Sequence, residues 1–277
     1  MRLVRYGEKG AETPGLWTGE GIIDLRTLFP DMPDVKESFF REGWLQRIEG
    51  ASAAPLNTPA RLGPPVASPM KIICVGRNYI EHVKEGNKEV PDHPLLFCKT
   101  PNALTGPFDE IILPKSSTKV DWEVELAVII GKEGKAIPED EAFGHIAGYT
   151  VMNDVSARDV QFGDTQWFRG KSFDTFAPLG PVLVTPDELE VEAGLRLTTI
   201  LNGELMQDGN TRDMIFPIPR LISFISRDIT LAPGDIIATG TPSGLGIFRD
   251  PPVLLKEGDE IACEIEGIGR IKNSVVA

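Results

Sequence analysis

The chain has 277 residues, enough to bury a substantial core without disulfides, as one large domain or as one with a small companion. It carries 41 Asp and Glu against 28 Lys and Arg, and the net charge of −13 would repel phosphate backbones and anionic membrane surfaces. Neither nucleic acid nor a membrane is therefore an expected partner. An acidic enzyme for anionic substrates would have to gather positive charge locally, through a bound cation and well-placed Lys or Arg side chains.

The cysteines and the N-terminus bear on the cell compartment. Cys74, Cys98 and Cys263 lie far apart and form no C-x-x-C pair, which argues against a disulfide framework and a zinc site. Residues 1–6 lack the apolar stretch of a signal peptide, and no run approaches the ~20 apolar residues of a membrane span. The cytoplasm is the expected location.

The N-terminal part of the chain predicts a small α+β domain. Short strand-like pieces at Leu3–Tyr6 and Gly21–Leu25 accompany an amphipathic stretch, Asp34–Ile48, whose aromatic residues have helical spacing. This pattern indicates an accessory unit with a modest core of its own.

A connector follows this unit. Residues Ser52–Pro69 are rich in Ala and Pro, including Pro59, and this composition favours an extended segment over a packed element. We therefore place the domain boundary in the connector. The expected division is a small domain at 1–66 and a catalytic domain at 67–277.

Strand signals dominate from Lys71 onward, separated by Gly, Pro and Asp turns. Helical patterns are few, chiefly Ser156–Phe162 and Ile218–Ser226, so the βα alternation of a doubly wound sheet is missing. The pattern predicts a mainly β fold of the α+β type, as a mostly antiparallel sandwich or rolled barrel. The expected strands are Lys71–Val75, Leu95–Cys98, Glu110–Leu113, Glu123–Ile130, Ile146–Asn153, Val182–Thr185, Leu195–Leu201, Ile236–Thr239 and Glu260–Ile265.

Two glutamates share one face of a predicted strand. In residues 121–130, alternation puts Glu123 and Glu125 on one face and Val124 and Leu126 on the other. Their Cα atoms would be roughly 7 Å apart, so both side chains could converge on one ion. Two bare carboxylates so placed would repel, and a cation resolves that conflict. The alternative is a solvated strand face.

Asp154 offers a third carboxylate at the end of the predicted strand Ile146–Asn153. The alternative is that Asp154 or Ser156 caps a helix, since Ser156-Ala157-Arg158-Asp159 resembles a capping box. Three oxygens without His or Cys suit a hard ion, Mg²⁺, Mn²⁺ or Ca²⁺, and disfavour zinc.

His82 and Glu85 stand at helical i, i+3 spacing after a predicted strand. A carboxylate there can orient the ring and raise its basicity, and histidine is suited to general-base work near neutral pH. A surface pair is the alternative. His93 and His145 have no such partner in the sequence.

Positively charged and polar side chains follow the candidate ligands. Lys171 lies in an aromatic, Gly-containing stretch and could meet a substrate carboxylate or enolate. Arg158 and Gln161, three apart on the helical pattern after Asp154, could reach the same place as anion and carbonyl ligands. Each of them could equally face solvent.

A glycine-rich segment, Gly240–Gly246, directly follows the predicted strand Ile236–Thr239. Its backbone N–H groups and the Thr241 hydroxyl could bind a carboxylate, and a plain turn is the alternative. The spacing G-x-x-x-x-G-K-[ST] is absent, which gives nucleotide phosphate binding little support.

These pieces occur together and in order in the fumarylacetoacetate hydrolase superfamily, and the sequence resembles its short, single-core members. The resemblance covers nearly all of residues 71–276. The segments that carry it are Val75–Tyr79 with His82, Asp121–Leu126, Asn153–Asp159, Gly170–Asp174 and Gly240–Gly244.

The resemblance implies a mixed β-roll with the site near the mouth of the sheet, and a homodimer as the usual assembly. It implies Mg²⁺ or Mn²⁺ on Glu123, Glu125 and Asp154, with His82 and Glu85 as a water-activating dyad on a lid segment at 80–91. Lys171, Gln161, Thr241 and, less directly, Arg158 match family contacts to substrate or transition state. The founding hydrolase has a longer N-terminal domain and takes its dyad glutamate from elsewhere, so fumarylacetoacetate is not the expected substrate.

The implied activity is hydrolysis of a carbon–carbon bond in an acylpyruvate or diketo acid, such as a fumarylpyruvate-like or diketo-deoxy-sugar acid. Water activated by His82 would attack the distal carbonyl, and a pyruvate enolate would leave, stabilised by the metal and Lys171. The alternatives on the same site are an oxaloacetate decarboxylase and a hydroxy-dienoate isomerase of the tautomerase type. A catalytically silent dimeric binding protein is a further alternative from another class.

Overall fold

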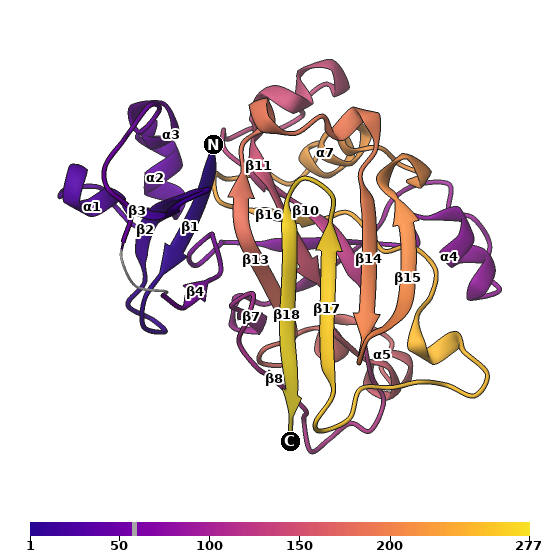
Figure 1. The fold of residues 1–277 in the computed structure, drawn as a ribbon. Helices are drawn as coiled ribbons and strands as arrows, with labels where there is room; N and C mark the ends of the chain where they lie inside the picture. The colour runs from indigo at the N-terminus through magenta and orange to yellow at the C-terminus, as the bar shows by residue number, and fades with distance from the viewer. Residues whose placement is uncertain (57–59) are drawn as a thin grey trace.

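Two β-sheets lie one in front of the other in the computed structural model, which describes residues 1–56 and 60–277 (Figure 1). Most neighbouring strands of the larger sheet are antiparallel, but β16 runs parallel to β5, and β7 to β13. From one edge to the other its strands are β3 Gly21–Asp24, β2 Thr13–Thr18, β1 Arg2–Tyr6, β13 Ala177–Val184, β11 Ile146–Asn153, β10 Val124–Ile130, β16 Ile236–Ala238, β5 Ile72–Gly76 and β6 Leu95–Lys99, with β4 Leu62–Gly63 beside β1 and β7 Leu104–Thr105 beside β13.

The second sheet and the larger one bury an apolar layer between them. Alternate side chains of β10, Val124, Leu126 and Val128, belong to one buried cluster with Leu197 and Ile265 of the second sheet. The mainly β, α+β fold predicted from the sequence is thus confirmed. The second sheet contains, in order, β15 Glu204–Asn210, β14 Arg196–Leu201, β17 Glu260–Ile265, β18 Gly269–Val276 and β8 Ile111–Ile112, and a minor sheet pairs β12 Ser156–Ala157 with β9 Val120–Asp121.

The helices of the molecule are short. Helix α7, Ile218–Ser226, has the predicted bounds because its apolar residues recur at helical spacing and are buried. Within residues 1–56 and 60–277 no helix is long and apolar enough to span a membrane. The other helices after the connector are α4 Ile80–Glu85, α5 Arg158–Gly163 and α6 Phe168–Lys171, with 3₁₀ turns η1 Pro101–Ala103, η2 Glu139–His145, η3 Pro186–Glu188, η4 Val191–Ala193, η5 Thr211–Asp213 and η6 Gly246–Phe248.

The predicted capping box at Ser156 is wrong. Ser156 lies in β12, and its hydroxyl donates to the backbone oxygen of Asp154 at 2.9 Å. Helix α5 starts two residues later, after Ala157, and no side chain caps it. The tie to β9 holds Ser156 in an extended conformation, which a helix start would not allow.

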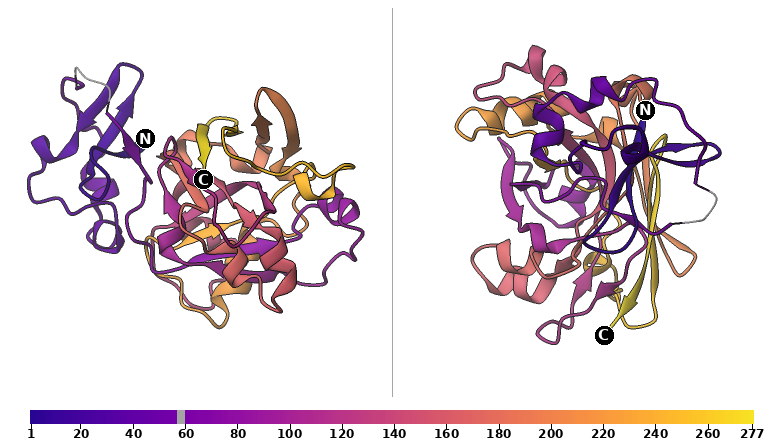
Figure 2. Two further views of the ribbon diagram at one scale, coloured as in Figure 1. Left: turned by 90° about the horizontal axis from the view of Figure 1, so that it is seen from below. Right: turned by 90° about the vertical axis from the view of Figure 1, so that its left-hand side faces the viewer.

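The N-terminal elements form a lobe beside the two sheets (Figure 2). The amphipathic stretch holds two helices rather than one, because Gly43 has a left-handed φ of 70° between them. β1 pairs with β13 through Leu3 and Leu183, so the lobe continues the large sheet, and the boundary at residue 66 stays a prediction. Pro59 lies outside the described residues. The helices of the lobe are α1 Leu25–Leu28, α2 Glu37–Arg41 and α3 Trp44–Arg47.

A chain of ion pairs fastens this lobe internally and to the rest of the molecule. The Arg5 guanidinium binds Glu12 at 3.1 Å and Asp34 at 2.7 Å. Arg61 binds Glu12 at 2.9 Å and also contacts Asp109, which lies beyond the connector. Glu12 therefore sits between two guanidinium groups, and the Arg5 and Glu12 side chains are 8% and 5% exposed.

Replacing Arg5 with alanine should lower the free energy of unfolding by about 3–5 kcal/mol, because Glu12 would keep its burial and lose one of its two cations. Denaturant titration followed by circular dichroism measures this change. The control is Arg41→Ala, which removes exposed ion pairs with Glu37 and Glu133 and should leave the unfolding free energy almost unchanged. Similar losses in both variants would contradict the prediction.

Candidate active site

The three carboxylates predicted as metal ligands meet beside the large sheet. Glu123 directly precedes β10, Glu125 is its second residue, and Asp154 directly follows β11. Val124 of β10 lies opposite Asn153 of β11, so these strand ends are together. One oxygen of each carboxylate lies within 4.8 Å of the other two, and all three side chains are buried. The fold therefore assembles an all-oxygen cluster.

Strand alternation explains the shared direction of the two glutamates. Val124 and Leu126 enter the cluster between the sheets, whereas Ala127 belongs to a separate cluster on the opposite face of the large sheet. Glu123 and Glu125 are 6% and 1% exposed. The alternative of a solvated strand face is therefore wrong.

Two buried lysines partly neutralise the cluster. Lys171 Nζ lies 2.8 Å from Asp154 and 3.0 Å from Glu123, and Lys99 Nζ lies 2.7 Å from the other oxygen of Asp154. Burial alone would lower the pKa of Lys171, but Asp154 and Glu123 outweigh it and raise that pKa above its usual value. Burial is the larger effect at Lys99 and lowers its pKa. The alternative of a surface position for Lys171 is excluded.

Arg158 is also buried and holds the cluster from the side of α5. Its Nε donates to Asp121 at 2.9 Å, and its Nη1 donates to Glu123 at 2.6 Å and to the Gln161 side-chain oxygen at 3.0 Å. Its Nη2 is buried and has no hydrogen-bond partner in the described part of the chain. The two N–H bonds of Nη2 thus remain for a ligand, while Nε and Nη1 bind two protein carboxylates and Gln161.

The Glu125 side chain forms no ion pair among residues 1–56 and 60–277, and its only hydrogen bond there comes from the Gly240 N–H at 2.9 Å. Burial, together with the charges of Asp154 and Glu123, raises the pKa of Glu125 well above its usual value. At Glu123, burial acts in the same direction, but Lys171 and Arg158 outweigh it and lower the pKa to about 2. A divalent ion would offset the remaining repulsion, and oxygen ligands suit Mg²⁺ or Mn²⁺.

A cavity of about 260 Å³ opens beside the carboxylates. Seven of the nine predicted site residues line it. The other two touch lining residues, since Asp154 binds Lys171 and Glu85 lies next to His82. The lining side chains include Arg77, His82, Lys88, Glu123, Glu125, Arg158, Gln161, Lys171 and Thr241, with Val75, Val83, Phe97, Phe162, Trp167 and Phe248.

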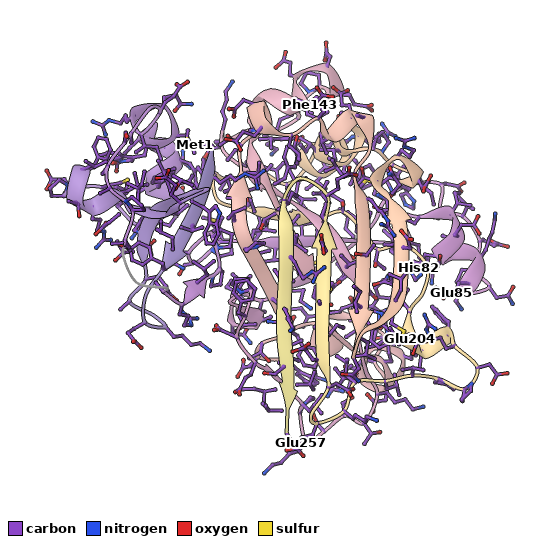
Figure 3. The ribbon with its side chains drawn as sticks, viewed as in Figure 1. Met1, His82, Glu85, Phe143, Glu204 and Glu257 are labelled. Atoms are coloured by element: carbon purple, nitrogen blue, oxygen red, sulfur yellow. The ribbon has the colours of Figure 1, made fainter. Side chains whose placement is uncertain are left out.

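His82 and Glu85 come from α4, at the edge of the molecule (Figure 3). His82 Nδ1 lies 3.7 Å from a Glu85 oxygen, beyond hydrogen-bonding distance, and has no other partner in the described residues. Both Glu85 oxygens accept from the Gly244 N–H, at 3.0 and 3.1 Å. The glutamate is therefore anchored, and a small shift of the ring would complete the predicted dyad.

The glycine-rich segment that follows β16 binds carboxylates of the protein itself. The sequence suggested that its N–H groups could bind a carboxylate, and at three glycines the carboxylate belongs to the protein. Thr241, in the same segment, lines the cavity and is 2% exposed. Gly240 donates to Glu125, Gly244 to Glu85 and Gly246 to Asp121.

The sequence model for the family described as fumarylacetoacetate (FAA) hydrolase C-terminal matches residues 71–276. The chain belongs to the fumarylacetoacetate hydrolase family. This confirms the resemblance drawn from the sequence motifs, and the matched range contains every predicted site residue.

Relatives within the family carry out different reactions. The mitochondrial oxaloacetate tautomerase FAHD2B of Bos taurus is 48% identical, over 100% of this chain and 92% of that protein. The 2,4-didehydro-3-deoxy-L-rhamnonate hydrolase of Sphingomonas sp. strain SKA58 is 42% identical, over 99% and 96%. The maleylpyruvate hydrolase of Sphingobium sp. SYK-6, solved with manganese(II) and pyruvate, is 32% identical with a TM-score of 0.81, over 100% and 99%.

These relatives are enzymes of the family, and the manganese in one of them agrees with the carboxylate cluster here in indicating a divalent metal. Sequence reasoning missed two buried members of the site, Lys99 and Asp121. Lys99 ends β6, one residue beyond the predicted strand, and a lysine closing an apolar strand was the available signal. Asp121 stood inside a motif already noted, but its contacts with Arg158 and the glycine-rich segment depend on tertiary structure.

Replacing Glu125 with glutamine should weaken Mn²⁺ binding by at least about 100-fold, because the amide keeps the size of the side chain and removes its charge. Isothermal titration of the metal-free protein measures the affinity. Glu81→Gln is the control, since Glu81 is exposed on α4 and pairs with Lys84. Unchanged Mn²⁺ affinity in Glu125→Gln would remove this residue from the ligand set.

Proposed function

We propose that this enzyme interconverts the keto and enol forms of a short 2-oxo dicarboxylic acid of the oxaloacetate type. The observation that carries the proposal is one small cavity lined by Glu123 and Glu125 of the buried carboxylate cluster, by two buried cations, Lys171 and Arg158, and by His82. Support for the substrate class comes from the bovine tautomerase, which matches the whole chain at 48% identity.

Glu123, Glu125 and Asp154 would hold the divalent metal, which when bound supplies Lewis-acid polarisation of the 2-oxo group. Lys171 adds a fixed positive charge beside the same carboxylates, where it can stabilise negative charge that develops on a substrate oxygen. The free Nη2 of Arg158 offers a hydrogen bond to a substrate carboxylate.

His82 is suited to move the proton. Enolisation removes a proton from carbon 3 and delivers one to the oxygen on carbon 2. The reverse reaction removes the proton from that oxygen and returns one to carbon 3. A histidine lining the cavity can take the carbon-bound proton as general base. The anchored Glu85 carboxylate, 3.7 Å away, would then stabilise the charged ring.

Arg77 supports a substrate with a second carboxylate. It follows β5, lines the cavity, and its guanidinium carbon lies 5.9 Å from the centre of the Trp167 ring. Among the described residues no Asp or Glu forms an ion pair with it. A cationic side chain kept at a cavity of an acidic protein, without a protein counter-ion, suits an anionic group of the ligand.

Hydrolysis of a carbon–carbon bond in a diketo acid is the second candidate. The His82–Glu85 pair favours it, because that pair can activate water, and the 42% identical relative from Sphingomonas is named as a hydrolase. His82 would take a proton from water, the hydroxide would attack the distal carbonyl, and the carbon–carbon bond would break to release an enolate and an acid.

Reaction products separate these candidates. With Mn²⁺ and oxaloacetate we expect the protein to speed up the loss of the enol absorbance, relative to the reaction without protein, with no release of carbon dioxide. Replacing His82 with alanine should lower kcat for this reaction by roughly 10²- to 10⁴-fold. The control is His93→Ala, an exposed histidine outside the cavity lining. Carbon dioxide release would instead identify a decarboxylase. Two acids formed from an acylpyruvate or diketo-deoxy acid, with oxaloacetate inert, would identify a hydrolase.

Replacing Arg77 with glutamine should raise KM for oxaloacetate roughly 10-fold or more, because a charged hydrogen bond to the second carboxylate is lost. The inhibition constant of pyruvate, which has no second carboxylate, should stay unchanged. Arg169→Gln is the control, since Arg169 is exposed and pairs with Asp164. Equal weakening of oxaloacetate and pyruvate in Arg77→Gln would argue against a dicarboxylate substrate.

Three expectations from the sequence remain proposals. The choice of Mg²⁺ or Mn²⁺ as the physiological ion is one, and metal-supplemented assays address it. The homodimer is another, supported by the family resemblance and open to measurement by light scattering. Cytoplasmic location is the third. The bovine relative, in contrast, is described as mitochondrial.

A further inference from the structure

Gln207 lies on β15 in the second sheet, fully buried behind the glycine-rich segment, and all four hydrogen-bonding positions of its amide are occupied. Its oxygen accepts from the Val124 backbone N–H at 3.1 Å and from the Thr199 hydroxyl at 2.8 Å. Its nitrogen donates to the Thr241 hydroxyl oxygen at 2.8 Å and to the Pro242 carbonyl at 2.9 Å.

The partners of Gln207 fix the orientation of its amide. The Val124 N–H can only donate a hydrogen bond, so it must face the amide oxygen, and the Pro242 carbonyl can only accept, so it must face the nitrogen. A flipped amide would place donor against donor and acceptor against acceptor. The group that meets Thr241 is therefore an N–H donor.

This orientation determines what Thr241 can do. Its hydroxyl oxygen already accepts from Gln207, so the hydroxyl hydrogen must be given to another acceptor. Thr241 lines the cavity beside Glu125, and in the described residues its hydroxyl donates to no protein acceptor. The threonine is therefore held as a hydrogen-bond donor towards whatever binds in the cavity.

The same amide also holds the strand that carries the metal ligands. Val124 stands between Glu123 and Glu125, and its N–H is the group bound to the Gln207 oxygen. One buried side chain of the second sheet thus joins the ligand strand to Thr241. The amide oxygen accepts the hydrogen bond from the ligand strand, and the amide nitrogen donates the hydrogen bond to the Thr241 hydroxyl.

We propose that Gln207 is a positioning residue that makes Thr241 a hydrogen-bond donor to an anionic oxygen of the bound 2-oxo acid. Gln207 does not touch the ligand itself. The inference rests on the proposed function for the class of ligand. It adds Gln207 as the residue that makes the Thr241 hydroxyl a hydrogen-bond donor to that ligand.

The test uses pyruvate binding to the full chain loaded with Mn²⁺, measured by isothermal titration. In Gln207→Glu the new carboxylate still accepts from Val124 and Thr199 but offers Thr241 an acceptor, so the hydroxyl hydrogen turns away from the cavity. We expect pyruvate affinity to fall roughly 10-fold or more, with Mn²⁺ affinity unchanged. A merely structural role would weaken Mn²⁺ binding as well. Gln46→Glu on α3, away from the cavity, controls for the added charge.

A double-mutant cycle gives the decisive comparison. Thr241→Val should lose as much pyruvate affinity as Gln207→Glu, and the double variant should bind no more weakly than either single variant. Additive losses would overturn the inference. Thr241→Val tests it even if Gln207→Glu does not fold, because pyruvate binding as tight as in the wild type would show that no hydrogen bond from Thr241 is made.

The outcomes also separate this inference from the proposed function. If the wild-type protein loaded with Mn²⁺ does not bind pyruvate, the proposed 2-oxo acid site and the role of Gln207 both fail. If the wild type binds pyruvate and Gln207→Glu binds it equally well, only the role of Gln207 fails.

Discussion

Three carboxylates buried within 4.8 Å of one another repel, and much of the surrounding structure offsets that repulsion. Lys171, Lys99 and Arg158 lie against Asp154 and Glu123, and each of them is buried at some cost in desolvation. Glu125 forms no ion pair in the described residues, and the attraction of Lys171 does not outweigh its burial and the charges of Asp154 and Glu123. Positive charge is therefore unevenly distributed over the three carboxylates, and a further cation could bind at Glu125, which borders the cavity.

The glycine-rich segment after β16 binds further carboxylates at and around the site. Its N–H groups hold a metal-ligand candidate, the α4 glutamate Glu85 and the Asp121 that fixes Arg158. At Gly244 the backbone is left-handed, with φ of 104°, and a Cβ atom would collide with the Met206 carbonyl oxygen of β15. The position of α4 over the cavity is therefore linked, through one glycine, to a strand of the second sheet.

The sequence predicted those features that follow from a local period. Alternation placed Glu123 and Glu125 on one face, and the apolar run before Asp154 marked a strand end, so the ligand cluster could be found without a structure. Lys99 and Gln207 could not be found in this way. Lys99 meets Asp154 from 55 residues away and Gln207 meets Val124 from 83 residues away, and strand pairing and contact between the sheets bring them together. β15 itself was missed because its sequence, ELMQDGN, has no regular apolar alternation.

The pairing of β1 with β13 has a consequence for how the protein can be divided. β1 covers the Leu183–Val184 end of β13, and Arg61 reaches Asp109 from the connector. A fragment that began after the connector would expose backbone N–H and C=O groups along that end of β13. Open edges of this kind recruit strands from other chains. The N-terminal lobe thus covers an edge of the large sheet, and we expect the isolated family region to associate through that edge.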